Sequence, residues 1–160
     1  VAIYDAGDTL PATKRSETDK KDMTDYLADG SGDYLERTAQ HYVLVLDENG
    51  MTQQALLPMK STQLKKSKQW NSAMRSLKMQ DDRGSWFTPP RFSHIWNLEA
   101  VAEENAHGSW HGWEISKDMP IEDPNIYAEA RLFAESIKAG QVKVQHVQEE
   151  DSLSEDDVPF

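Results

Sequence analysis

The sequence predicts an α+β domain in which a small, barrel-like antiparallel sheet and two helices precede a disordered, acidic C-terminal tail. Three observations lead to this prediction: an Asn-Gly pair separates two strand-like runs, two later segments have apolar residues at helical spacing, and residues 148–157 contain almost no apolar side chain. The 160 residues correspond to about one domain. We expect a flexible polar segment over residues 1–38, the folded domain over 39–147 and the tail over 148–160.

The first element of the folded domain is predicted to be a β-hairpin. Its strands would be residues 41–46 and 51–59, because Asn49 and Gly50 between them both tolerate positive φ in a tight turn. Before the hairpin we expect a short strand over residues 1–4, a weak helix over 18–28 and a glycine-containing loop over 29–33.

A helix is predicted over residues 61–78, with Ser61 as its N-cap. Leu64, Met74 and Leu77 fall near one face with Ala73 beside them, while the lysines spread over the other face. Residues 81–85 should end this helix. Strands are then expected over residues 86–99, kinked at the Pro89-Pro90 pair, and over residues 108–116.

The second predicted helix has clear signals at both ends. Asp123 is the expected N-cap, Pro124 occupies the first helical position and Gly140 marks the stop. Its apolar stripe consists of Ile126, Ala130, Phe133 and Ile137. A last strand over residues 141–147 would complete the domain.

Composition excludes several classes of protein. The chain has no cysteine, which removes disulfides, thiolate metal sites and thiol nucleophiles. No apolar run of about 18 residues is present, so we expect no membrane partner. The first residue is Val1 rather than Met, and we expect further sequence upstream.

Charge is distributed very unevenly along a chain whose net charge is −11. Residues 60–91 hold eight of the 17 basic residues and only two acids, whereas residues 148–160 hold six acids and no base. All five tryptophans lie between residues 70 and 113. Cations that follow phosphates and rings that stack on bases are what single-stranded nucleic-acid binders need. The candidate binding residues are Lys60, Lys65, Lys66, Lys68, Trp70, Arg75, Trp86, Phe87, Arg91, Phe92, Trp96, Trp110 and Trp113.

The end of the tail carries a specific motif. The run Asp156, Asp157, Val158, Pro159 and Phe160 resembles the C-terminal tip of bacterial single-stranded DNA-binding proteins, in which acids precede an aliphatic residue, Pro and a terminal Phe. The resemblance implies that these five residues dock onto replication or repair enzymes, with the ring and carboxylate of Phe160 entering an apolar pocket with a basic rim.

The middle of the chain, from about residue 40 to 147, is similar to a group of phage-encoded proteins found beside replication and recombination genes. Residues 40–47 (QHYVLVLD), 59–71 (MKSTQLKKSKQWN), 87–92 (FTPPRF) and 108–114 (GSWHGWE) carry this similarity. Together the two resemblances imply a phage-type single-stranded DNA-binding protein in the cytoplasm of an infected bacterium. The fold they imply is an oligonucleotide-binding (OB-type) barrel, and a homo-oligomer is one of the assemblies that stay open.

Two alternatives from other classes stay open. The acidic surface could mimic nucleic acid and inhibit a host enzyme, as a decoy. A metal-dependent nuclease could use His107, His111 and Glu104, but Gly108 and Gly112 disfavour a helix that would bring these side chains together. We find no phosphate loop or nucleophile motif, so the sequence predicts no enzyme, no cofactor and no metal.

Overall fold

The computed structural model describes residues 8–16, 19, 24–106 and 108–142. Over these residues the chain is α+β, with two α-helices and strands that all pair in antiparallel fashion. None of the sheets in this part of the chain closes into a barrel, so the barrel-like, OB-type sheet is not confirmed. The two long hairpins each remain two-stranded and do not pair with one another. A helix contacts both of them, so helix packing takes the place of the strand pairing that a closed sheet would need.

The N-terminal part forms a small three-stranded sheet in the order β1-β2-β3. Tyr26 and Tyr34 pack edge to face on it, with their ring centroids 6.5 Å apart. The helix predicted over residues 18–28 is wrong in the part described, because residues 25–27 pair as a strand; the strand predicted over residues 1–4 lies outside the described residues. The strands are β1 (Thr13–Lys14), β2 (Asp25–Leu27) and β3 (Tyr34–Leu35).

The predicted hairpin is confirmed as β4 (Thr38–Leu46) paired with β5 (Thr52–Lys60). Its turn is organised by Asp47, whose Oδ1 accepts hydrogen bonds of 2.8 Å from the backbone N–H groups of Asn49 and Met51. Gly50 has φ +77°, while Asn49 keeps a negative φ. The turn therefore uses only one of the two residues that tolerate positive φ.

Helix α1 (Gln63–Ser76) follows β5 closely. Ser61 is not its N-cap: this residue has φ +49° in the turn from β5, and Thr62 occupies the cap position. The buried residues of α1 are Ser67, Trp70 and Met74. The apolar face is therefore centred on Trp70 and Met74, and the helix ends two residues before the expected Lys78.

The strand predicted over residues 86–99 is divided in the structure. Its first part is β7 (Trp86–Phe87), which pairs with β6 (Met79–Gln80) across the turn over residues 81–85. Pro89 and Pro90 then separate β7 from a short 3-10 helix, since proline cannot continue a ladder. The elements that follow are η1 (Arg91–Ser93), β8 (His94–Asn105) and β9 (Gly108–Pro120). The last two form a long hairpin that contains the predicted 108–116 strand.

Helix α2 (Pro124–Lys138) is confirmed together with its predicted ends. The Asp123 carboxylate accepts from the backbone N–H of Asn125 at 2.8 Å and of Ile126 at 3.4 Å, and Gly140 follows the helix with φ +67°. Residues 141 and 142 are not in a strand, and the rest of the strand predicted over 141–147 lies outside the described residues.

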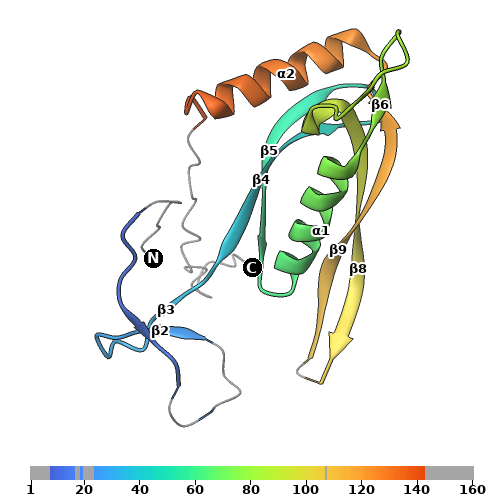
Figure 1. Cartoon of the computed structure of the whole chain (residues 1–160). Helices are drawn as coiled ribbons and strands as arrows, with labels where there is room; N and C mark the ends of the chain where they lie inside the picture. The colour runs from blue at the N-terminus through green and yellow to red at the C-terminus, as the bar shows by residue number, and fades with distance from the viewer. Residues whose placement is uncertain (1–7, 17–18, 20–23, 107, 143–160) are drawn as a thin grey trace, which may run out of the picture.

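The main core lies where α1 meets the two long hairpins. Figure 1 shows α1 between the β4–β5 and β8–β9 hairpins, with α2 across the top of the molecule. Met59, Trp70 and Met74 are its buried members, so β5 and α1 supply the centre. The half-buried side chains that pack against them come from all four strands: Ala39, Val43, Leu57, Trp96, Leu98, Trp113 and Ile115.

Candidate nucleic-acid interface

The solvent face of α1 carries a line of cations. Lys65, Lys68 and Arg75 are exposed and lie three and seven residues apart, which places them on one side of the helix. None of the three has an ion-pair partner among the described residues, and α1 itself contains no acid. We call these three residues the cationic stripe. It extends about 15 Å along the helix, at 1.5 Å per residue.

Two other predicted lysines are neutralised by carboxylates. Lys60 lies 3.0 Å from Glu36, whose hydrogen bond raises the pKa of the lysine. Lys66 pairs with Glu103 in an environment where both side chains are only 26% exposed. These two lysines therefore contribute less free positive charge than the stripe, and the less exposed Lys66–Glu103 pair also joins α1 to β8.

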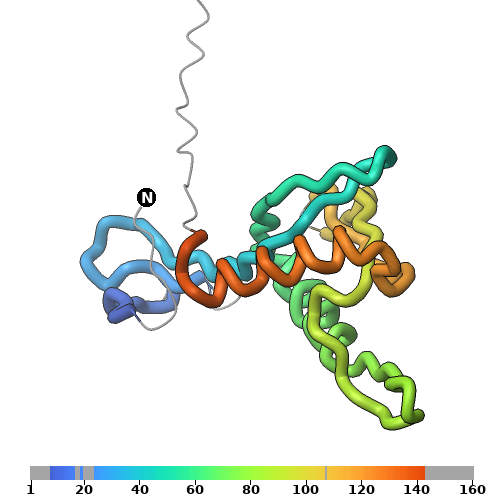
Figure 2. The backbone as a smooth tube through the Cα atoms, turned by 90° about the horizontal axis from the view of Figure 1, so that it is seen from above, coloured from blue at the N-terminus to red at the C-terminus, as the bar shows by residue number. Residues whose placement is uncertain are grey.

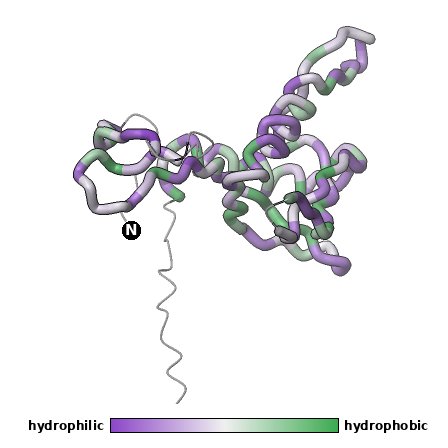
Figure 3. Tube along the Cα trace, turned by 90° about the horizontal axis from the view of Figure 1, so that it is seen from below, coloured by the Kyte–Doolittle hydropathy of each residue, from purple (hydrophilic) through white to green (hydrophobic). Residues whose placement is uncertain are grey.

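An arm (residues 78–88) projects directly from the end of α1. Asp81 organises its turn, because its carboxylate accepts from the backbone N–H groups of Arg83 and Ser85. Lys78 Nζ donates to Thr88 Oγ1 at 2.7 Å and closes the base of the arm. Figures 2 and 3 show the arm standing clear of the rest of the molecule. The arm can therefore be reached from several sides.

The rings of the arm are accessible to solvent. Trp86 is 68% exposed and Phe87 is 42% exposed, although both are apolar and belong to β7. Arg83 is exposed at the turn, and Arg91 follows the arm and donates to Asn71 Oδ1 at 3.2 Å. The arm thus combines exposed aromatic rings with cations, next to the stripe.

The other predicted aromatic residues are buried or half-buried. Trp70 contacts Trp96 edge to face at 6.2 Å between ring centroids, and His41 stacks on Trp70 at 4.8 Å. Burial lowers the pKa of His41, and the nearby charge of Arg91 lowers it further. Phe92 packs edge to face on Tyr127 of α2, at 5.4 Å. Trp113 belongs to the core, and Trp110 is half-buried.

Glu103 on β8 is a residue that sequence reasoning missed. Its carboxylate accepts from Lys66 Nζ, from Trp110 Nε1 at 2.8 Å and from Gln63 Nε2 at 3.5 Å. The hydrogen bonds from Lys66 and Trp110 hold the pKa of Glu103 below its usual range. Gln63 also accepts from the backbone N–H of Trp113 at 3.1 Å, so this cluster joins α1 to the far end of the β8–β9 hairpin.

Gly112 leaves room for the side chains of Gln63 and Glu103 at this junction. A Cβ placed on Gly112 would lie 2.5 Å from both Gln63 Nε2 and Glu103 Oε2. In the sequence, only the lysine-rich helix pointed to this junction. Lys66 and Glu103 are 37 residues apart, and no local sequence pattern predicts that two residues so far apart will pair.

The described residues contain neither a cluster of metal-ligating side chains nor a helix that could span a membrane. Among the described residues, no three His, Cys, Asp or Glu side chains lie close enough together to hold a metal ion. His111 is exposed on β9 opposite Ala102, Glu104 lies opposite Ser109, and His107 lies outside the described residues.

In the part of the chain that is described, neither helix has the length and apolarity needed to cross a membrane. The tail motif over residues 156–160 also falls outside it.

A sequence model of Pam3 phage gp34-like proteins matches residues 1–143. The chain belongs to this family. Membership of the Pam3 phage gp34-like family indicates a bacteriophage protein, and the match includes the stripe, the arm and the N-terminal sheet. No curated protein and no solved structure matches the chain significantly.

The Glu103 cluster should make stability depend on pH. Because the folded-state pKa of Glu103 is lowered, its stabilisation is complete above the ordinary glutamate pKa of about 4.3 and is lost as pH falls through the lowered folded value. We expect Glu103→Gln to unfold at lower urea concentration than the parent at pH 7. The difference should shrink as pH falls below about 4.3. An equal difference at pH 7 and pH 3.5 would contradict an ionised Glu103 at the junction.

Proposed function

We propose that the chain binds single-stranded DNA along the cationic stripe and the arm. The observation that carries this proposal is the exposure of Trp86 and Phe87 beside unpaired cations, in a chain whose net charge is −11. Adjacent exposed apolar side chains often mark a binding site, and base stacking is a contact that rings beside phosphate-binding cations are suited to make. Membership of a phage family is consistent with this role.

The arrangement favours a single strand over a duplex. A single strand has unstacked bases that Trp86 and Phe87 can contact, while its phosphates can follow Lys65, Lys68 and Arg75. Duplex bases are stacked on one another and present only their edges in the grooves. The mode of action would be stoichiometric coating of the strand, and the tail would recruit replication or repair proteins.

Reversing the charge of the stripe should abolish binding without unfolding the protein. In the triple variant Lys65→Glu, Lys68→Glu, Arg75→Glu, all three positions are exposed, so the melting temperature should change little. Fluorescence titration with oligo-dT measures binding. Each single Ala change should reduce the slope of log affinity against log salt by about 0.7, because one fewer counterion is released.

The matched control for this experiment is on α2. Arg131 and Lys138 are exposed cations on a helix that does not carry the proposed interface, and their double change to Glu alters the net charge as much as the double change Lys65→Glu, Lys68→Glu on the stripe, with which it is compared. This control should bind oligo-dT much as the parent does. If both variants lose affinity equally, net charge rather than the stripe determines binding.

The two classes of tryptophan should separate on mutation. Trp86→Ala should leave the melting temperature unchanged and weaken oligo-dT binding by about 1–3 kcal/mol, since the ring is exposed and its proposed partner is a base. Trp70→Ala should instead destabilise the fold by about 3–5 kcal/mol, because Trp70 is at the centre of the core. Unchanged binding by a folded Trp86→Ala protein would exclude the arm.

The tail tip is tested separately from DNA binding. Removing Phe160 should leave oligo-dT affinity unchanged and eliminate the pull-down of replication or repair proteins from host extract, because the docking ring is lost. Removing all of residues 149–160 gives the comparison with an acidic decoy: a decoy would lose inhibition of its target with its acids, whereas a DNA binder keeps its affinity. Identical pull-downs with and without Phe160 would show that the tail resemblance is accidental.

A further inference from the structure

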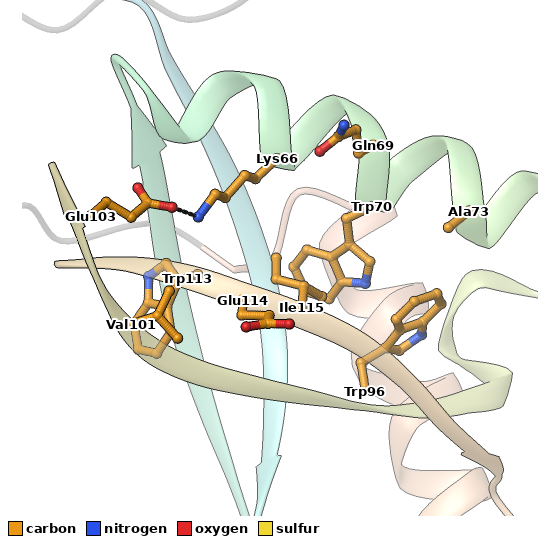
Figure 4. A pocket seen from close by; sticks show the side chains of 10 residues that line it. All are labelled: Lys66, Gln69, Trp70, Ala73, Trp96, Val101, Glu103, Trp113, Glu114 and Ile115. Atoms are coloured by element: carbon orange, nitrogen blue, oxygen red, sulfur yellow. Dashed lines mark hydrogen bonds and ion pairs between the residues drawn. The ribbon is translucent and has the colours of Figure 1, made fainter. Parts of the chain in front are cut away.

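A cleft of about 370 Å³ lies between α1 and the β8–β9 hairpin. Three tryptophans line it, Trp70 from the helix and Trp96 and Trp113 from the strands, as Figure 4 shows. Gln69 and Glu114 add polar groups to the lining. Its volume is in the range of small-ligand sites, but the paired Lys66 and Glu103 also line it, so polar groups make up a larger part of its wall than in a typical apolar pocket.

Two hydrogen-bond donors in the lining of this cleft have no acceptor. The indole Nε1 atoms of Trp70 and Trp96 are both buried and unpaired among the described residues, and the Trp70 side chain as a whole is only 7% exposed. A buried donor without an acceptor costs free energy, and most native structures avoid it. The walls therefore offer ring surface to a guest, and a guest's acceptor atom reaches either N–H group only if the ring turns, because both nitrogen atoms are covered.

The cleft is next to the cationic stripe on the same helix. With 3.6 residues per turn, Gln69 projects from α1 between Lys65, a stripe residue, and Lys66, which lines the cleft. A strand whose phosphates follow the stripe would have its bases within reach of the cleft. Glu114 also lines the cleft, and its carboxylate can accept a hydrogen bond from an amino or imino group.

We propose that the cleft receives one unpaired nucleobase, an inference that rests on single-strand binding by the stripe and the arm. The base stacks on the indole walls, its ring nitrogen or carbonyl oxygen accepts from Trp70 or Trp96, and Glu114 accepts from its N–H edge. Since both indole nitrogens are covered, the rings turn slightly when the base enters. The base is thereby held in a fixed orientation, which the open stacking surface of the arm does not provide.

The test uses nucleosides, which have a base and no phosphate. In the ¹⁵N-labelled full chain, the indole N–H signals of Trp70 and Trp96 should shift saturably on titration with each of the four deoxynucleosides, and the signal of Trp86 should not saturate. Trp96→Phe keeps a ring in the core, assigns one signal by its loss, and should weaken nucleoside binding about fivefold through the lost hydrogen bond. Tyr127→Phe is the control: it also removes one polar atom from a half-buried ring, but Tyr127 packs on Phe92 and does not line the cleft, so this variant should bind nucleosides as the parent does.

The outcomes separate this inference from the proposed function. If Trp86→Ala loses oligo-dT binding and the parent shows no saturable shift of the Trp70 or Trp96 signals, the base site is overturned. The proposal that the arm binds DNA is then supported. Saturation by nucleosides in a protein that does not bind oligo-dT supports the site and overturns the proposed function. N-acetyl-phenylalanine amide serves as a competitor: if it binds the cleft as tightly as the nucleosides do, the cleft takes an apolar protein side chain and the inference is wrong.

Discussion

The packing of α1 against both long hairpins is the contact on which the rest of the fold depends. A two-stranded hairpin is marginally stable alone in water, and neither β4–β5 nor β8–β9 gains a third strand in the described residues. Trp70 and Met74 supply the apolar side of this contact, and His41 on β4 hydrogen-bonds to the buried Ser67 at 2.8 Å. Glu103 fixes the opposite side through Lys66. One helix therefore replaces the sheet closure that a barrel would have provided.

Because α1 packs against both hairpins, its surface is divided into a packed side and a solvent side. The side toward the hairpins is occupied by core residues and by the Glu103 junction, and the charged residues on the side toward solvent are all cations. The chain has 28 acids, yet none of those described forms an ion pair with Lys65, Lys68 or Arg75. Exposed ion pairs contribute little to stability, so their absence costs the fold almost nothing. The same absence leaves the stripe's field free for an anionic partner.

The sequence predicts local structure well where a signal lies within a few residues. Asp123, Pro124 and Gly140 gave the ends of α2, and Asn49-Gly50 gave the first hairpin. An equivalent turn at Asp81 to Gly84 makes the same hydrogen bonds, but the two-residue strands beside it are too short to show a pattern. Features that depend on residues far apart in the chain could not be predicted. Neither the open sheets nor the pairing of Lys66 with Glu103 has a local signature, and the burial of each tryptophan depends on where the hairpins meet α1.

This division decides which substitutions can report on function. A change at Trp70 or Lys66 disturbs both the core and any site beside it, so lost binding there has two explanations. The stripe and the arm carry no such ambiguity, because Lys65, Lys68 and Trp86 are exposed and contribute little to packing. Substitutions in the cleft are intermediate in this respect, since the tryptophans of its walls also belong to the core or pack against it. Only a change that keeps the ring can separate the effect of a lost hydrogen bond from the effect of lost packing. Function placed on the solvent face of a structural helix can vary without loss of the fold, whereas function placed between helix and hairpin is constrained by it.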